Sequence, residues 1–247
     1  MEERTVRLEV PPDAPDPTSY LRAAWRAAVA AGADRVELLV GPADHRLRRA
    51  AHRAGFLHEG VLRKARITVD GSEDVHLYAV VSGDEHDGPG GFSFVMNAVL
   101  PRTRVIAHAV FRDAEDRILF LQVSYKADWE LPGGIVEARE SPREGAEREV
   151  LEEIGLRRSL TRLLVVDWLP PYLGWDDAVE FIFDGGVLTA DEIAAIELND
   201  GEIVSAAWLP AATAATHLSD LAARRLLWLD ENRPETAAYF EHGRPGL

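Results

Sequence analysis

The segment from Gly134 to Leu156 constrains the fold more than any other part of the sequence, because it specifies a loop, a helix and the end of that helix. Ser141 and Glu144 have the spacing of a capping box, and Pro142 stands at the first helical position, where a missing N–H costs nothing. Gly155 suits the left-handed conformation that ends many helices. The pattern predicts a helix of about 13 residues between these ends.

One face of this predicted helix is acidic. At about 100° per residue, Glu149, Glu152 and Glu153 fall together, opposite the apolar residues. Like charges three and four positions apart destabilise a helix by a few tenths of a kcal/mol each, unless a cation lies between them. Magnesium prefers oxygen ligands and often joins protein carboxylates to substrate phosphates, so it would remove that penalty. Taken alone, the three glutamates also fit an ordinary solvated face.

The complete pattern favours the metal site, because fixed residue types at fixed spacings rarely coincide by chance. The segment resembles the signature of the Nudix hydrolases at every position, and WELPG at 129–133 resembles the usual entry to it. The similarity extends over about residues 100–230. The matching residues are Gly134, Glu140, Arg148, Glu149, Val150, Glu152, Glu153, Gly155 and Leu156.

The resemblance implies a fold and a reaction. The fold class is α/β (α+β), an α/β/α sandwich with a mixed sheet. The reaction is cleavage of the diphosphate bond in a nucleoside diphosphate linked to another moiety, by attack of water at phosphorus, with Mg²⁺ or Mn²⁺ as cofactor. The physics agrees, because bound metal neutralises the anionic substrate and lowers the pKa of bound water.

The family's roles carry over to the matching positions. Glu149 would bind metal or activate the attacking water, and Arg148 would orient the carboxylates through charge-assisted hydrogen bonds. Glu140 would be a further ligand or a partner of Arg148. The resemblance makes Arg148, Glu149, Glu152 and Glu153 the candidate catalytic residues, and it makes Glu149, Glu152, Glu153 and the Gly133 carbonyl, with Glu140 and Glu197 in addition, the candidate metal ligands.

A carboxylate from outside the helix often completes such a site. Glu197, Asp200 and Glu202 precede a predicted strand at Ile203–Leu209, and Glu180 lies on a predicted strand at 178–183. Glu197 is favoured by its distance ahead of the strand in MutT-like members. An ordinary surface acid is the alternative for each of them.

Aromatic rings that could hold a base are the candidates for substrate selection. Core packing or loop rigidity explains each of them about as well. The candidate substrate-binding residues are Trp129, Trp168 and Tyr172.

The first third of the chain reads as a separate unit. The glycine-rich run SGDEHDGPGGFS at 82–93 predicts a linker, so the expected domains are 1–85, a linker at 86–93, and a Nudix hydrolase domain at 94–247. The runs AGF at 54–56 and EGVLR at 59–63, with Tyr78 downstream, resemble the carboxy-terminal half of GNAT acetyltransferases, which implies a small partial GNAT-like α/β unit.

This unit is expected to lack acetyltransferase activity. Where the family has its acetyl-CoA pyrophosphate loop, the chain reads PPDAPDPTSY at 11–20. Phosphate binding needs free backbone N–H groups and glycine, and four prolines in this run provide neither. A role in packing, dimerisation or domain contact is expected instead.

Composition excludes several classes of protein. With 42 acidic and 27 basic side chains the formal net charge is −15, which disfavours a nucleic acid strand as partner. The absence of cysteine excludes disulfides and thiolate metal sites. No apolar run is long enough for a membrane span, and the amino terminus lacks a secretory pattern, so a cytoplasmic protein is expected.

A small nucleotide-like phosphate compound is therefore the expected partner, and a homodimer is compatible with the sequence. Two alternatives stay open. One is a nucleotide-sensing binding module in which the Nudix fold is catalytically silent, and the other is a bifunctional GNAT acetyltransferase and Nudix protein.

Overall fold

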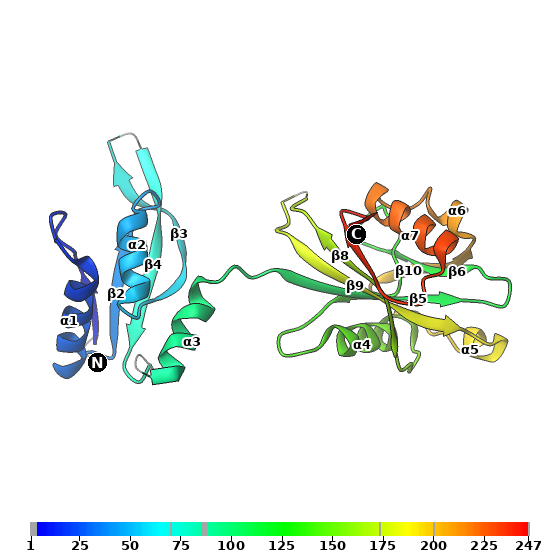
Figure 1. The fold of residues 1–247 in the computed structure, drawn as a ribbon, viewed down its shortest axis with the longest axis horizontal. Helices are drawn as coiled ribbons and strands as arrows, with labels where there is room; N and C mark the ends of the chain where they lie inside the picture. The colour runs from blue at the N-terminus through cyan, green and yellow to red at the C-terminus, as the bar shows by residue number, and fades with distance from the viewer. Residues whose placement is uncertain (1–3, 70, 85–87, 173, 200, 247) are drawn as a thin grey trace. The chain divides into compact units, whose positions relative to one another are not determined.

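The computed structural model describes residues 4–69, 71–84, 88–172, 174–199 and 201–246. The chain divides into two compact units, Met1–Pro101 and Arg102–Leu247 (Figure 1). Each unit has its own hydrophobic core, so each is described by itself.

The N-terminal unit is a mixed sheet with the strand order β1-β2-β4-β3 and helices packed on it. Strand β1 runs parallel to β2, and the other neighbours are antiparallel. The core contains Leu21 and Trp25 of the first helix together with Phe56 and Tyr78. The elements are β1 (Thr5–Leu8), α1 (Pro17–Ala30), β2 (Arg35–Val40), α2 (His45–Arg53), β3 (Leu57–Thr68), β4 (Gly71–Val81) and α3 (Gly88–Val99).

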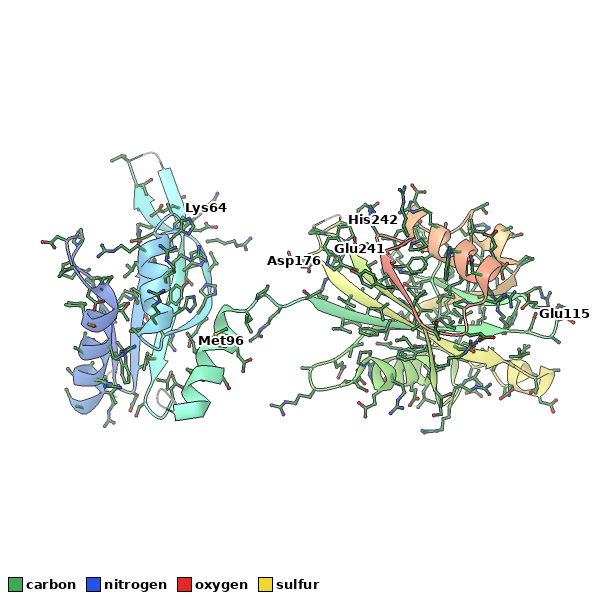
Figure 2. All side chains as sticks on the ribbon, in the orientation of Figure 1. Lys64, Met96, Glu115, Asp176, Glu241 and His242 are labelled. Carbon is green, nitrogen blue, oxygen red and sulfur yellow. The ribbon has the colours of Figure 1, made fainter. Side chains whose placement is uncertain are left out.

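Helix α3 corrects the predicted linker at 86–93. From Gly88 onward these residues are helical, and the second compact unit begins at Arg102 rather than at residue 94. Residues 86 and 87 lie outside the described residues. The reason for the difference is that Phe92, Met96 and Val99 follow the glycines at helical spacing, so the apolar pattern outweighs the glycine content. Met96 is labelled on this helix in Figure 2.

The C-terminal unit is built on a mixed sheet with the strand order β10-β6-β5-β9-β8-β11-β12, and β7 pairs with β5. Strands β5 and β9 are parallel, as are β8 and β11. The strands are β5 (Arg104–Arg112), β6 (Ile118–Val123), β7 (Gly133–Ile135), β8 (Arg162–Leu169), β9 (Ala178–Val187), β10 (Ile203–Leu209), β11 (Ala238–Glu241) and β12 (Arg244–Pro245), and the helices are α4 (Pro142–Ile154), α5 (Ala190–Ala194), α6 (Ala211–Ala214) and α7 (Asp220–Asn232).

Successive residues of β5 face opposite helical layers, as the alternation of a strand requires. Ala109 and Phe111 belong to the core that contains Val150 of α4. Val110 belongs to the core that contains Leu226 of α7. Figure 1 shows α4 on one side of the sheet and α6 and α7 on the other. The predicted α/β/α sandwich with a mixed sheet is confirmed.

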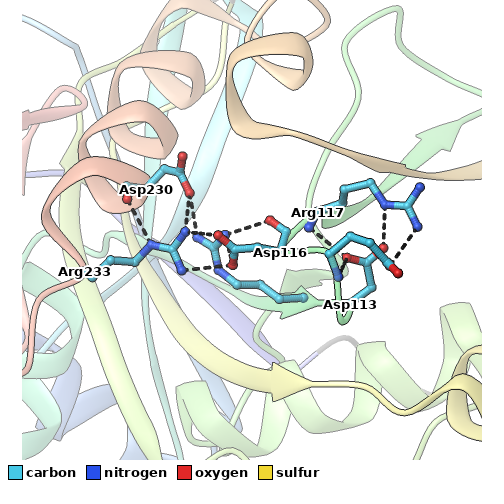
Figure 3. A network of polar contacts seen from close by, with 7 residues as sticks. Asp113, Asp116, Arg117, Asp230 and Arg233 are labelled. Atoms are coloured by element: carbon cyan, nitrogen blue, oxygen red, sulfur yellow. Dashed lines mark hydrogen bonds and ion pairs between the residues drawn. The ribbon is translucent and has the colours of Figure 1, made fainter.

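Ion pairs hold the end of α7 to the turn between β5 and β6 (Figure 3). Arg233 ends the helix in a left-handed conformation, with φ 42°, and its Nη1 donates to Asp116 Oδ1 at 3.0 Å. In the turn itself, buried Asp113 accepts hydrogen bonds from the backbone N–H groups of Glu115 and Arg117. The Arg233–Asp116 pair links the end of α7 to this turn, and α7 forms one wall of the site described next.

Candidate functional site

Helix α4 begins and ends where the sequence predicts. Ser141 is its N-cap, and the reciprocal bonds between Ser141 and Glu144 form the capping box. Gly155 closes the helix with φ 72°. The local sequence therefore sets where the helix that carries the predicted acidic face begins and ends.

Arg148 joins three of the predicted carboxylates. Its Nε lies 3.0 Å from Glu140 Oε1, and its Nη1 lies 2.9 Å from Glu149 Oε1 and 3.0 Å from Glu152 Oε2. Its Nη2 also donates to the Ile135 carbonyl of β7 at 3.1 Å. The hydrogen bond from Arg148 is the main reason why the pKa of Glu140 lies below its usual value. Glu140 is therefore a partner of Arg148 in this arrangement.

Glu153 is the most buried of these acids, at 4% exposure. Its Oε2 accepts a hydrogen bond from the Gly133 N–H at 2.7 Å. Burial raises its pKa from 4.5 to about 8 in spite of this bond. Burial also raises the pKa of Glu149, against the opposing effect of Arg148. Both carboxylates thus lie where negative charge is disfavoured and where a cation would be stabilising.

Two glycines allow β7 to lie close to these groups. A Cβ on Gly133 would lie 2.2 Å from the Ala107 carbonyl oxygen, and its φ is +134°. A Cβ on Gly134 would lie 3.0 Å from the carboxyl carbon of Glu149. Side chains at these positions would separate β7 from β5 and displace Glu149.

Glu149, Glu152 and Glu153 form one part of the wall of a cavity of about 1190 Å³. Residues of β5, β9 and α7 and of the 128–131 and 169–172 segments are among those that line the rest of it. Trp129 and Tyr172 are among these residues, so their role in substrate contact stays a prediction, and the Trp129 ring stacks on His217 with ring centroids 5.0 Å apart. Within the described part of the chain, Trp168 is not a lining residue; it lies on β8 and is 39% exposed.

The structure brings Glu202, rather than Glu197, to the cavity lining. Negative charge on Glu202 contributes to the raised pKa of both Glu149 and Glu153. Glu197 lies at the carboxyl end of α4, where its N–H donates to the Ile154 carbonyl. The role of Glu197 as a ligand stays a prediction. The position of Glu202 directly before β10, which pairs with β6, is the signal that favours it.

A buried ionic network beside the cavity was not predicted. Arg225 donates to Asp167 Oδ2 at 2.8 Å and to Glu180 Oε1 at 2.7 Å. His108 Nδ1 lies 2.9 Å from the same Glu180 oxygen. Burial alone would raise the pKa of Glu180, but Arg225 and His108 outweigh it and bring the pKa to about 2. Glu180, one of the alternatives for an extra ligand, is thus neutralised within this network.

The carboxylates fit a hard divalent cation in their chemistry, because oxygen donors are what Mg²⁺ and Mn²⁺ prefer. In the part of the chain that the structure describes, no three His, Cys, Asp or Glu residues are already arranged around a common point that could hold a metal ion. Arg148 Nη1 donates to one oxygen each of Glu149 and Glu152. Burial raises the pKa values of Glu149 and Glu153, because their negative charges are poorly solvated there. A bound cation would therefore be accommodated beside them.

A search of the described helices finds none with the length and apolar character needed to cross a membrane.

Residues 102–229 match the NUDIX domain family. The chain is 34% identical over 131 residues to the human 8-oxo-dGDP phosphatase NUDT18, which covers 47% of this chain but only 38% of the human protein. It is 32% identical over 145 residues to a CMP-5'-(N-acetyl-N-hydroxy-3-aminopropyl)phosphonate hydrolase of Streptomyces rubellomurinus, covering 56% of this chain and 66% of that protein. The chain thus spans about two fifths and two thirds of the length of these relatives.

Solved structures are similar as well. The MutT protein from Methanosarcina mazei Go1 is 24% identical, with a TM-score of 0.47, and the similarity covers 55% of this chain and 99% of that one. A UDP-X diphosphatase is 18% identical, with a TM-score of 0.45, covering 62% of this chain and 75% of that one.

Proposed function

The chain belongs to the NUDIX family, as the match over residues 102–229 establishes, and from this premise we propose that it hydrolyses the phosphoanhydride bond of a nucleoside diphosphate linked to another moiety. The observation that carries the proposal is the convergence of Glu149, Glu152 and Glu153 on one wall of a large cavity. Burial raises the pKa values of Glu149 and Glu153, so this wall is suited to a cation, and the cation would bind a phosphate of the substrate.

The residues of the wall would divide the work. Glu149, Glu152 and Glu153 would hold Mg²⁺ or Mn²⁺, with the Gly133 carbonyl in support. When bound, such a cation neutralises phosphate charge and makes its bound water more acidic. The Glu149 carboxylate is also suited to accept the proton of the attacking water, because a raised pKa makes a carboxylate a stronger base. We propose Glu202 as the additional carboxylate in place of Glu197.

Arg148 would act as a positioning residue. It ties Glu149 and Glu152 to Glu140 and to the β7 carbonyl of Ile135, so the carboxylates keep one geometry as the substrate enters. Trp129 and Tyr172 would contact the parts of the substrate that do not react. The names of the two curated relatives, an 8-oxo-dGDP phosphatase and a CMP-phosphonate hydrolase, favour a nucleotide.

The test is release of phosphate or nucleotide from a panel of nucleoside triphosphates, nucleotide sugars, dinucleotides and ADP-ribose, with Mg²⁺ or Mn²⁺. We expect metal-dependent turnover of at least one class by the wild type and its loss in Glu152→Gln and Glu153→Gln. Glu137→Gln is the matched control, because this glutamate is exposed in the loop between β7 and α4. No turnover on the whole panel, or unchanged turnover in both site variants, contradicts the proposal. Tight nucleotide binding without turnover would indicate a sensing module.

For the N-terminal unit we propose a structural role without acetyl transfer. The Asp16 side chain accepts hydrogen bonds from the N–H groups of Thr18 and Ser19 at the start of α1, so these amides are already satisfied. A pyrophosphate would need such groups free. Calorimetric titration of the full chain with acetyl-CoA tests this, and binding at or below millimolar concentration would contradict it.

A further inference from the structure

The cavity of the C-terminal unit has two chemically different ends. One end carries the acidic side chains around α4 and β7, which are Glu130, Glu149, Glu152, Glu153 and Glu202. The other carries basic and aromatic side chains, which are Arg104, Tyr172, Trp175, Arg224, His242 and Arg244.

Strand pairing places the second set at one end of the sheet. Arg104 at the start of β5 pairs with Ala178 at the start of β9, and Ala178 pairs with Leu169 at the end of β8. The His242 N–H donates to the Trp168 carbonyl of the same strand end. Figure 2 shows Asp176, Glu241 and His242 at this end of the unit and Glu115 at the opposite end.

The two ends are separated along β5. Gly133, whose N–H donates to Glu153, pairs with His108 of β5. Arg104 lies four residues before His108 on β5. At about 3.3 Å per residue the separation is about 13 Å. A ligand that reaches both ends must therefore extend well beyond its diphosphate.

Arg104 and Arg224 are held by backbone and ring contacts, and within the described residues neither forms an ion pair with a carboxylate. The Arg104 guanidinium lies 4.6 Å from the centroid of the Trp175 ring and donates to the Asp176 carbonyl. Arg224 donates to the His242 carbonyl at 2.9 Å. Within the described part of the chain, the Nε of each is buried without a hydrogen-bond partner.

Arg225 gives the contrast within the same cavity. It is 4% exposed and lies between Asp167 and Glu180, so its charge is neutralised. Asp220, in the first turn of α7, also lines the cavity and offsets one positive charge. Among the described residues that line the cavity at this end, three arginines stand against this one acid, so the lining itself is positively charged; Asp176 and Glu241 lie at the same end of the unit but do not line the cavity.

We propose that this basic end binds an anionic group, a carboxylate or a phosphate, carried by the substrate at a distance from the diphosphate that is cleaved. The inference rests on the proposed function, because it places the diphosphate at the glutamate end. Guanidinium groups suit both anions, since they donate parallel N–H bonds in a planar fork. Arg104 is also braced against Trp175, which lowers the cost of ordering it.

The test uses ligand pairs that differ in one anionic group. UDP-glucuronate and UDP-glucose differ by a carboxylate, and NADPH and NADH differ by a phosphate. Initial rates with Mg²⁺ give kcat/KM for each member, and calorimetric titration in the presence of Ca²⁺ gives the affinity. We expect the anionic member of at least one pair to be favoured by about 10- to 100-fold, as hydrogen bonds to charged groups imply. Preference in only one pair identifies that group as the ligand.

Variants assign the preference to the basic end. Arg104→Gln and Arg244→Gln are expected to reduce the ratio within the favoured pair at least fivefold, while Arg104→Lys keeps part of it. Arg244 is exposed, so its variant keeps the fold even where that of Arg104 does not. Arg157→Gln is the control, because this exposed arginine lies outside the cavity lining.

Two outcomes overturn the inference: equal values within both pairs, or a ratio that survives both glutamine variants. Binding preference without any hydrolysis would contradict the proposed function but leave this inference standing. Hydrolysis without preference would support the proposed function and contradict this inference.

Discussion

Helices α1 and α4 begin in the same way and are used differently. Each has a polar N-cap followed by proline at the first helical position, Asp16 and Pro17 in one and Ser141 and Pro142 in the other. Each cap accepts backbone N–H bonds from the first turn. The local chemistry that starts a helix is thus shared by both units.

The difference lies in what the helices meet. Helix α1 buries Leu21 and Trp25, and the Trp25 indole donates to the Ala54 carbonyl at 2.8 Å, so its buried face serves packing. Helix α4 buries Val150 but also Glu153, which meets the glycine strand β7. The pKa of a carboxylate is raised where tertiary packing removes it from water, and the way in which its helix begins does not cause that shift.

The largest effect should come from the glycine that brings β7 close to α4. Gly133→Ala places a Cβ 2.2 Å from the Ala107 oxygen at a φ of +134°, and we expect it to lower the free energy of unfolding by about 4 kcal/mol or more. Gly32, just after α1, has a φ of +98° but nothing within 4 Å of an added Cβ, so Gly32→Ala should cost about 1–2 kcal/mol. Urea unfolding followed by circular dichroism measures both. Equal costs would show that steric approach at β7 does not matter.

The next effect is a pH dependence of stability that belongs to α4. The folded-state pKa of Glu153 is about 8 against an ordinary value of 4.5, so the folded protein holds an extra proton between these values. Its contribution to stability is therefore greatest below pH 4.5 and is lost as the pH rises towards 8, by about 5 kcal/mol at most. The difference in unfolding free energy between Glu153→Gln and wild type should thus grow with pH when EDTA is present.

Asp16 of α1 should behave in the opposite way. Hydrogen bonds from Ser19 lower its pKa, so its contribution is present above the ordinary value of 3.8 and lost as the pH falls below it. Wild type and Asp16→Asn should therefore converge in stability at acidic pH. For Glu153, a difference in unfolding free energy between Glu153→Gln and wild type that does not change between pH 5 and pH 9 would contradict the argument that burial raises its pKa.

Arg148 provides the third comparison, this time in activity. Arg148→Gln releases Glu140, Glu149 and Glu152 from one another, and we expect kcat/KM to fall on the order of 100-fold, as for residues that orient metal ligands. Arg22 on α1 also donates to a backbone carbonyl, that of Arg53, and Arg22→Gln should leave kcat/KM unchanged. Steady-state kinetics on the best substrate of the panel decides. A loss below threefold for Arg148→Gln would remove its positioning role.

The smallest effect is expected from the helix cap itself. Ser141→Ala removes the capping box of α4 and should cost about 1 kcal/mol of stability with little change in kcat/KM. Ser159→Ala, at an exposed position after the helix, is the control. Urea midpoints and initial rates measure the two properties. A large loss of activity without loss of stability would mean that the cap itself contributes to the site.

Local chemistry explains which features could be predicted. The bounds of α4 and its acidic face follow from residues within four positions of one another, so a sequence alone contains them. The linker predicted at 86–93 is helical from Gly88 onward, because the apolar spacing that follows the glycines favours a helix over a loop. Local sequence does not decide between Glu197 and Glu202, because the choice depends on how β10 pairs with β6, which brings segments about 80 residues apart together.

The sequence by itself therefore determined the helix, its caps, the order of its carboxylates and the sandwich that the signature implies. Tertiary structure alone decided that Glu153 is buried, that Arg225 is neutralised by Asp167 and Glu180, and that the cavity has an acidic and a basic end. The reason is that pKa values and charge balance depend on which groups from distant strands share a low-dielectric space, and strand pairing sets that.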